Sequence, residues 1–154
     1  MSDAVNRASA PGLEALLNRP SAAVLPAPLR EALLQWWDAA DTSHEMRGSS
    51  LSILADTLDA LALLSADEGA VLAALLFDLP GLRAHLDVLP LGSHKAAVAG
   101  LLDGQDAADP VWALHAGREA GRNSEGLRRL LLAIIHDLRV VPILLARQLA
   151  RMRA

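Results

Sequence analysis

The sequence predicts a single all-α domain. With 154 residues, the chain is long enough to bury a hydrophobic core and short enough to be one domain. Alanine and leucine dominate, 53% of the residues are hydrophobic and only 3% are aromatic, which favours a compact helical protein over a β-sandwich. Apolar residues also recur at helical spacing, in segments that proline and glycine separate.

The N-terminal part is predicted to precede the main domain. Residues 1–27 are expected to form a loose lead-in, a short helix that begins at Pro11, and a connector punctuated by prolines. Pro28 then occupies the first turn of the next helix, where its missing N–H is not needed. At least one ring of the Trp36-Trp37 pair on this helix is expected in the core. The main helical domain is therefore predicted at residues 28–154.

The remaining helices follow from leucine spacing and from capping patterns. They are predicted at about 50–64, 66–77, 93–102 and 110–120, with a final pair after residue 124. Ser65 and Glu68 form a capping-box pattern ahead of the second of these helices. Asp103-Gly104 is predicted to end the third. Asp137 and Pro142 predict that the final pair is bent or broken between them.

Composition and charge exclude several classes of function. The chain has no cysteine, which excludes disulfides and thiolate catalysis and is compatible with a reducing cytoplasm. Its net charge of -4 argues against direct binding of nucleic acid. No apolar run reaches the ~18 residues that span a bilayer, and the N-terminal residues lack the pattern of a signal peptide. We therefore expect a cytoplasmic protein that does not enter a membrane.

The last third of the chain carries the most specific pattern. It contains Arg-Arg-Leu at 128–130, Ala-Ile at 133–134, Asp-Leu-Arg-Val-Val at 137–141, Leu-Ala at 145–146, Leu149, and Met-Arg at 152–153. This framework resembles the closing helices of the HD-type hydrolase domain of RelA/SpoT proteins, which make and destroy (p)ppGpp. The segment from Ala73 to Asp78 is similar to the Ala-Ala-x-Leu-His-Asp motif of the same family. The resemblance covers roughly residues 50–153 and implies an HD-domain-like helical bundle.

The same resemblance implies a degenerate metal site. In that family two imidazoles and two carboxylates are expected to hold one divalent ion, manganese, which polarises a phosphate ester and activates water. Ile53 and Phe77 stand at the imidazole positions and Arg147 at the distal carboxylate, while the Glu-Asp pair that assists catalysis falls on Gly81-Leu82. One remaining carboxylate cannot hold the ion, and a guanidinium would repel it. We therefore expect no catalytic residue, no metal and no cofactor. The predicted former site consists of Ile53, Phe77, Asp78, Arg147 and Arg151.

An ion pair is expected to replace the metal. Arg147 is placed to supply a positive charge to Asp78, while Phe77 and Ile53 fill the volume of the lost imidazoles. Arg151 is expected to point into the same pocket, although arginines near a helix C-terminus are also favoured by the helix dipole. Asp78 has a competing interpretation as a helix cap or a solvated carboxylate.

The histidines are not interpreted as metal ligands. His136 is adjacent to Asp137 but is interpreted as a surface residue at a helix end, because its position has no ligand role in the family. His44 and Arg47 are weak matches for the base-stacking arginine of the family, because the segment around them is not preserved. The other histidines show no spacing typical of metal ligands.

A degenerate hydrolase domain is what RelA-type monofunctional synthetases carry at their N-terminus. The resemblance therefore implies an N-terminal fragment of a GTP pyrophosphokinase of the stringent response, with no catalysis of its own. Its expected partner is the synthetase domain of the same polypeptide, and contact with the ribosome and uncharged tRNA would pass only through regions outside this chain. Two alternatives stay open. One is an active metal-dependent (p)ppGpp phosphohydrolase with displaced ligands, and the other is a free-standing helical adaptor.

Overall fold

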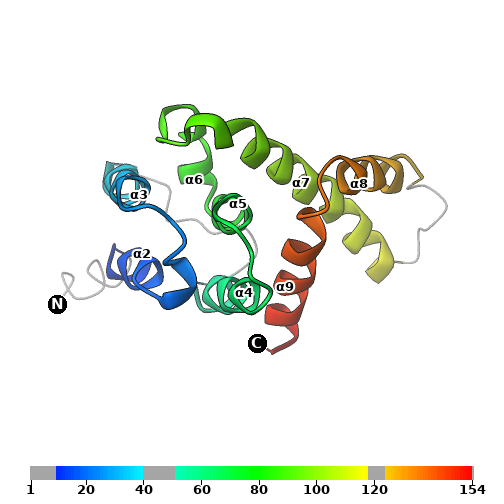
Figure 1. Cartoon of the computed structure of the whole chain (residues 1–154). Helices are drawn as coiled ribbons and strands as arrows, with labels where there is room; N and C mark the ends of the chain where they lie inside the picture. The colour runs from blue at the N-terminus through cyan, green and yellow to red at the C-terminus, as the bar shows by residue number, and fades with distance from the viewer. Residues whose placement is uncertain (1–9, 40–50, 118–123, 154) are drawn as a thin grey trace.

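The computed structural model describes residues 10–39, 51–117 and 124–153, and the elements in these ranges are all helical (Figure 1). The α-helices are α2 (Ala10–Leu17), α3 (Ala27–Ala39), α4 (Leu51–Leu63), α5 (Glu68–Asp78), α6 (Pro80–Arg83), α7 (Lys95–Gly117), α8 (Ser124–His136) and α9 (Val140–Arg153). Short 3-10 turns lie at Pro20–Ala22, Leu86–Val88 and Gly92–His94. The all-α prediction is confirmed. None of the helices in the described ranges is long and apolar enough to cross a lipid bilayer.

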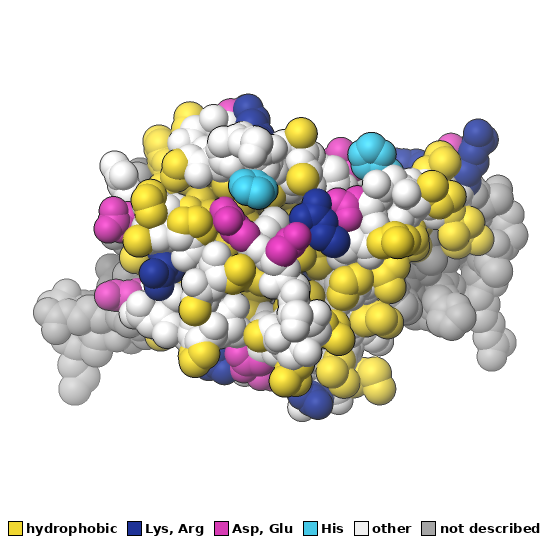
Figure 2. All heavy atoms as spheres, viewed as in Figure 1, with side chains coloured by type: hydrophobic (Ala, Val, Ile, Leu, Met, Phe, Trp, Pro, Cys, Tyr) yellow, Lys and Arg dark blue, Asp and Glu magenta, His cyan; other side chains and the backbone are white. Residues whose placement is uncertain are grey.

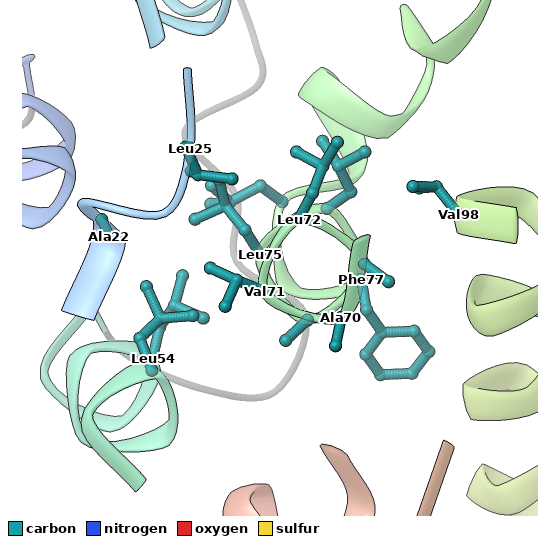
Figure 3. Packing of buried hydrophobic residues seen from close by; sticks show 14 of the residues in the cluster. Ala22, Leu25, Leu54, Ala70, Val71, Leu72, Leu75, Phe77 and Val98 are labelled. Carbon is teal, nitrogen blue, oxygen red and sulfur yellow. The ribbon is translucent and has the colours of Figure 1, made fainter. Parts of the chain in front are cut away.

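Helix α5 lies at the centre of the bundle. Its residues from Gly69 to Asp78 are all buried, and α4, α7 and α9 pack around it (Figures 1 and 3). Because the helix is apolar on nearly every face, it must be covered on all sides. The capping prediction at Ser65 was wrong. Asp67 caps the helix, with its Oδ1 accepting a hydrogen bond from the Ala70 N–H at 3.0 Å, whereas Ser65 sits in a left-handed turn with φ of 55°.

The N-terminal elements belong to the same core as the rest of the bundle. The short helix predicted from Pro11 is α2, and its Leu13 and Leu17 are buried in one hydrophobic cluster with the leucines of α5. The core therefore continues across the boundary predicted between residues 27 and 28. The tryptophan prediction is confirmed, because Trp37 is buried and Trp36 is half-buried, stacking on the His85 ring at 4.1 Å between centroids.

The two helices predicted at 93–102 and 110–120 are one helix. Helix α7 runs without interruption from Lys95 to Gly117, so the break predicted at Asp103-Gly104 is wrong. Gly104 is buried inside this helix, where a Cβ would lie 2.7 Å from Val140 Cγ2 of α9. The glycine therefore permits close packing of two helices, and it does not end one of them.

The break predicted in the C-terminal pair is confirmed. Helix α8 ends at His136 and α9 begins at Val140, with Asp137 at the turn. The Asp137 carboxylate accepts hydrogen bonds from the backbone N–H of Arg139, at 3.0 Å, and from its guanidinium. The guanidinium also donates to Asp67 at 2.9 Å, which joins this turn to the N-terminus of α5. The hydrogen bonds from Arg139 hold the pKa of Asp137 below its usual range.

Candidate functional site

The most unusual feature of the core is a buried charged pair. Asp78 is the last residue of α5 and is 0% exposed, and Arg147 lies in the middle of α9 and is 4% exposed. Arg147 Nε lies 3.5 Å from Asp78 Oδ1. The predicted ion pair between these two residues is confirmed. The competing interpretation of Asp78 as a solvated carboxylate is wrong, because the side chain is enclosed by the bundle.

Other contacts hold the Arg147 guanidinium in one position. Its Nη1 donates to Gln105 Oε1 of α7 at 2.6 Å, and its Nη2 donates to the Ala74 carbonyl oxygen of α5 at 3.1 Å. The guanidinium carbon also lies 4.6 Å from the centre of the Phe77 ring, within the range of a cation–π contact. Figure 3 shows the Phe77 ring extending from α5 on the side that faces α7 and α9. Arg147 thus connects three helices.

Gln105, which was not among the predicted site residues, completes this buried cluster. Its Nε2 donates to the Ala73 carbonyl oxygen at 3.0 Å, while its Oε1 accepts from Arg147. The buried amide therefore has partners for both of its polar atoms. A signal was present in the sequence, because a lone glutamine lies at helical spacing from the buried Leu101 and Ala108.

The electrostatics of the pair follow from its burial. Burial is the largest influence on the pKa of Arg147 and lowers it, while the negative charge of Asp78 acts in the opposite direction. A guanidinium stays protonated in proteins, so the cluster contains one positive and one negative charge in a dry environment. Removing either partner would leave the other charge buried without compensation.

The other two residues of the predicted former site are Ile53 and Arg151. Ile53 is half-buried on α4, and its carbonyl oxygen accepts a hydrogen bond from Thr57 Oγ1 at 2.8 Å. Arg151 is exposed on the last turn of α9, so the expectation that it points into the pocket is wrong. The physical reason is charge. Arg151 already lowers the pKa of Arg147 by repulsion, and a second buried guanidinium beside one carboxylate would be strongly unfavourable.

None of the histidines whose side chains the structure describes is part of this cluster. His136 is exposed at the end of α8, as predicted for a surface residue at a helix end. His44 and Arg47, the weak matches for a base-stacking arginine, lie outside the described residues. Within residues 10–39, 51–117 and 124–153, no three His, Asp or Glu side chains are close enough together to hold a metal ion.

The groups around Asp78 do not fit a divalent metal ion. Such an ion needs several carboxylate or imidazole ligands, and Asp78 instead faces the guanidinium of Arg147. The neighbouring Phe77 ring and Gln105 amide are engaged with the same guanidinium. The chemistry of this cluster is therefore that of a structural ion pair.

Metal analysis tests whether the cluster is a structural ion pair or a metal site. After incubation with excess Mn²⁺ or Zn²⁺ and removal of unbound ion, the purified chain is expected to retain far less than one metal ion per molecule, because Arg147 repels a cation from Asp78. Elemental analysis by mass spectrometry measures the molar ratio of metal to protein. Retention of about one manganese or zinc ion per chain, lost on replacement of Asp78 with asparagine, would show that Asp78 is a ligand after all.

Comparison with known proteins gives one match. Residues 34–154 match the family model described as the HD domain, a range that includes α4 to α9 and the whole buried cluster. No curated protein and no solved structure matches the chain significantly.

Proposed function

Since the chain belongs to the HD domain family, we propose that it is a catalytically inactive member in which an internal ion pair stands in place of a metal centre. The observation that carries the proposal is the burial of Arg147 against Asp78, at 3.5 Å between Nε and Oδ1. In the hydrolases that the sequence resembles, these two positions hold metal ligands. Here Arg147 occupies one of these positions, and its positive charge is neutralised by the carboxylate of Asp78 at the other.

The finer form of the proposal concerns the parent protein. The framework of α8 and α9 resembles the closing helices of RelA/SpoT hydrolase domains, which supports assignment to a RelA-type (p)ppGpp synthetase. In such a protein this domain acts as a structural and regulatory module for a synthetase domain of the same polypeptide. Regulation of that kind requires contacts that differ between two states of the synthetase. The chemistry, transfer of pyrophosphate from ATP to GTP or GDP, belongs to the partner domain.

A free-standing helical adaptor is the second candidate, and the surface of α8 favours it. Several large apolar side chains of this helix are exposed: Leu127, Leu131, Leu132 and Ile135. None of the side chains described for α8 is fully buried, although more than half of them are apolar. A helix of this composition is suited to being covered by another protein surface. Reading the gene beyond codon 154 separates the candidates, because a following synthetase domain supports the module and a stop codon supports the adaptor.

An activity assay tests the inactive state directly. Incubated with ppGpp and excess Mn²⁺, the chain is expected to release no pyrophosphate above the rate without protein, because the cluster around Asp78 cannot activate water through a metal. Anion-exchange chromatography of the nucleotides measures GDP formation. The matched control is the Asp78→Asn variant, which should give the same background. Turnover by the parent chain that disappears in this variant would contradict the proposal and support the active phosphohydrolase alternative.

A further inference from the structure

Helix α8 has two apolar faces, and only one of them is packed. Its half-buried Leu130 and Ile134 contact the hydrophobic core. Ala133 faces α7, because its Cβ lies 3.4 Å from the position that a Cβ of Gly104 would take. The second face carries large exposed side chains: Leu127, Leu131, Leu132 and Ile135. This surface is called the outer face of α8 below.

The outer face is open to solvent over most of its length. Figure 1 shows α8 beside α7, on the opposite side of the molecule from α2 and α3, and Figure 2 shows hydrophobic side chains gathered at the side where α8 and α9 lie. The four apolar side chains of the outer face are 47–76% exposed. Together they expose several hundred Å² of apolar surface, which is the size of the largest patches on monomeric proteins, and such patches often bind a partner.

The outer face is symmetric about Leu131. Leu127 lies four residues before it and Ile135 four residues after it, so the three side chains form one ridge along the helix. Ridges of residues four apart pack into the grooves of another helix, which is the commonest way in which helices pair in globular proteins. When two copies of this ridge pair in antiparallel, Leu131 meets itself at a two-fold axis, and Leu127 of each copy meets Ile135 of the other. The ridge is therefore complementary to itself.

The charge on this face favours the antiparallel direction. The exposed Arg128 lies three residues before Leu131, so it belongs to the same face. In an antiparallel pair with Leu131 on the axis, Arg128 of one copy lies opposite Ile134 of the other, in the last turn of α8. The carbonyl oxygens at a helix C-terminus carry partial negative charge and attract a cation. In a parallel pair, the two copies of Arg128 would instead lie side by side and repel each other.

We propose that α8 pairs in antiparallel with α8 of a second copy of this chain, through the ridge of Leu127, Leu131 and Ile135. A homodimer of this kind covers both outer faces at once. With the polar rim, the buried surface approaches the lower end of specific interfaces, about 1,200 Å² in total, so the dimer is expected to dissociate in the micromolar range. The inference goes beyond the proposed function and does not depend on it, because the outer face includes no residue of the Arg147–Asp78 cluster. Its failure leaves the metal and ppGpp tests unchanged.

Sedimentation velocity over a range of protein concentrations tests the proposal. The parent chain is expected to change from monomer to dimer as its concentration rises through the micromolar range. Leu131→Glu places two carboxylates against each other at the axis, so it is expected to raise the dissociation constant by at least about tenfold. Arg128→Glu is also expected to weaken the dimer, because it puts a negative charge beside the carbonyl oxygens of the opposite helix.

Matched variants control for general effects of charge and exposure. Leu145 on α9 and Val88 in the 3-10 turn are each 58% exposed, close to the 50% of Leu131, but neither belongs to the outer face. Leu145→Glu and Val88→Glu are therefore expected to dimerise as the parent chain does. Arg129 is exposed on α8 but lies two residues before Leu131, on a different face, so Arg129→Glu should weaken the dimer less than Arg128→Glu. Circular dichroism on each variant verifies that the fold is retained.

Engineered cysteines test the direction of pairing, and the chain has no cysteine of its own to interfere. A disulfide needs Cα atoms within about 7 Å of each other. In the antiparallel pair, two copies of position 127 lie eight residues apart along the axis, about 12 Å, so Leu127→Cys chains are expected not to cross-link with one another. The same holds for Ile135→Cys. An equimolar mixture of the two variants is expected to form a cross-linked heterodimer under mild oxidation, which non-reducing electrophoresis and mass spectrometry detect.

Four results would overturn the proposal. A parent chain that stays monomeric at its highest soluble concentration does not pair through α8. A dimer that Leu131→Glu leaves intact forms through another surface. Cross-linking of Leu127→Cys with itself, but not with Ile135→Cys, would show a parallel pair. Binding of a monomeric parent chain to vesicles of anionic phospholipid, lost in Leu131→Glu, would assign the outer face to a membrane surface.

Discussion

Replacing Arg147 with alanine is expected to destabilise the domain by about 3–5 kcal/mol, the usual effect of breaking a buried ion pair on one side. The variant loses hydrogen bonds to Gln105 and to the Ala74 carbonyl oxygen, and it leaves Asp78 charged in an enclosed site. Denaturant titration followed by circular dichroism measures the change in the free energy of unfolding. A loss below about 1 kcal/mol, the range of exposed pairs, would mean that the guanidinium is not buried in solution.

Two further variants make this experiment specific. Arg153→Ala removes the same side chain from the exposed end of α9 and is expected to change stability by less than about 0.5 kcal/mol. The double variant Asp78→Asn with Arg147→Met removes both charges. Its loss in the free energy of unfolding is expected to be smaller than the sum of the losses in Asp78→Asn alone and Arg147→Met alone. The reason is that neither charge is then left buried without its partner. Strict additivity would mean that the two residues do not interact.

Replacing Gly104 with alanine is expected to destabilise the domain by about 1–3 kcal/mol, even though alanine favours a helix more than glycine does. The added Cβ would lie 2.7 Å from Cγ2 and 3.3 Å from Cγ1 of Val140. Val140 is fully buried and branched at Cβ, which restricts the rotation of its side chain. Helices α7 and α9 must then separate. Thermal or denaturant unfolding measures the effect.

The chain supplies an internal control for this prediction in Gly100. It lies on the same helix, α7, but a Cβ there would meet nothing within 4 Å. Gly100→Ala is therefore expected to stabilise the domain by up to about 1 kcal/mol, through helix propensity alone. Val140→Ala in the Gly104→Ala background should recover part of the lost stability, because the clash is removed. Stabilisation by Gly104→Ala itself would contradict the close packing of α7 on α9.

Most helices could be predicted because their cause is local. Leucine spacing, proline in the first turn and the turn at Asp137 act within a few residues, and the structure has helices where these signals occur. Gly104 shows where local reasoning fails. A glycine after an aspartate indicates a helix end, but here the absence of a side chain serves a contact with α9 that is distant in the sequence. Tertiary packing overrode the local signal.

In the candidate site, too, some features could be predicted from the sequence and others could not. Comparison with a family pattern placed Arg147 and Asp78 in one pocket, and physical chemistry then required them to pair. The pattern contained no position for Gln105, so this partner was found only from the structure. The family pattern also placed Arg151 near the pocket, but it did not give the direction of the Arg151 side chain. That direction depends on which charged groups already occupy the pocket, and a sequence pattern does not contain this information.

The Arg147–Asp78 pair also limits the evolutionary routes open to this protein. A single substitution of Arg147 by aspartate would bury two carboxylates together and would leave Gln105 Oε1 and the Ala74 carbonyl oxygen without their donor. Such an intermediate is destabilised before any new ligand for a cation has appeared. Replacing the pair by metal ligands would therefore require several substitutions at once, and single substitutions at either position are expected to be selected against.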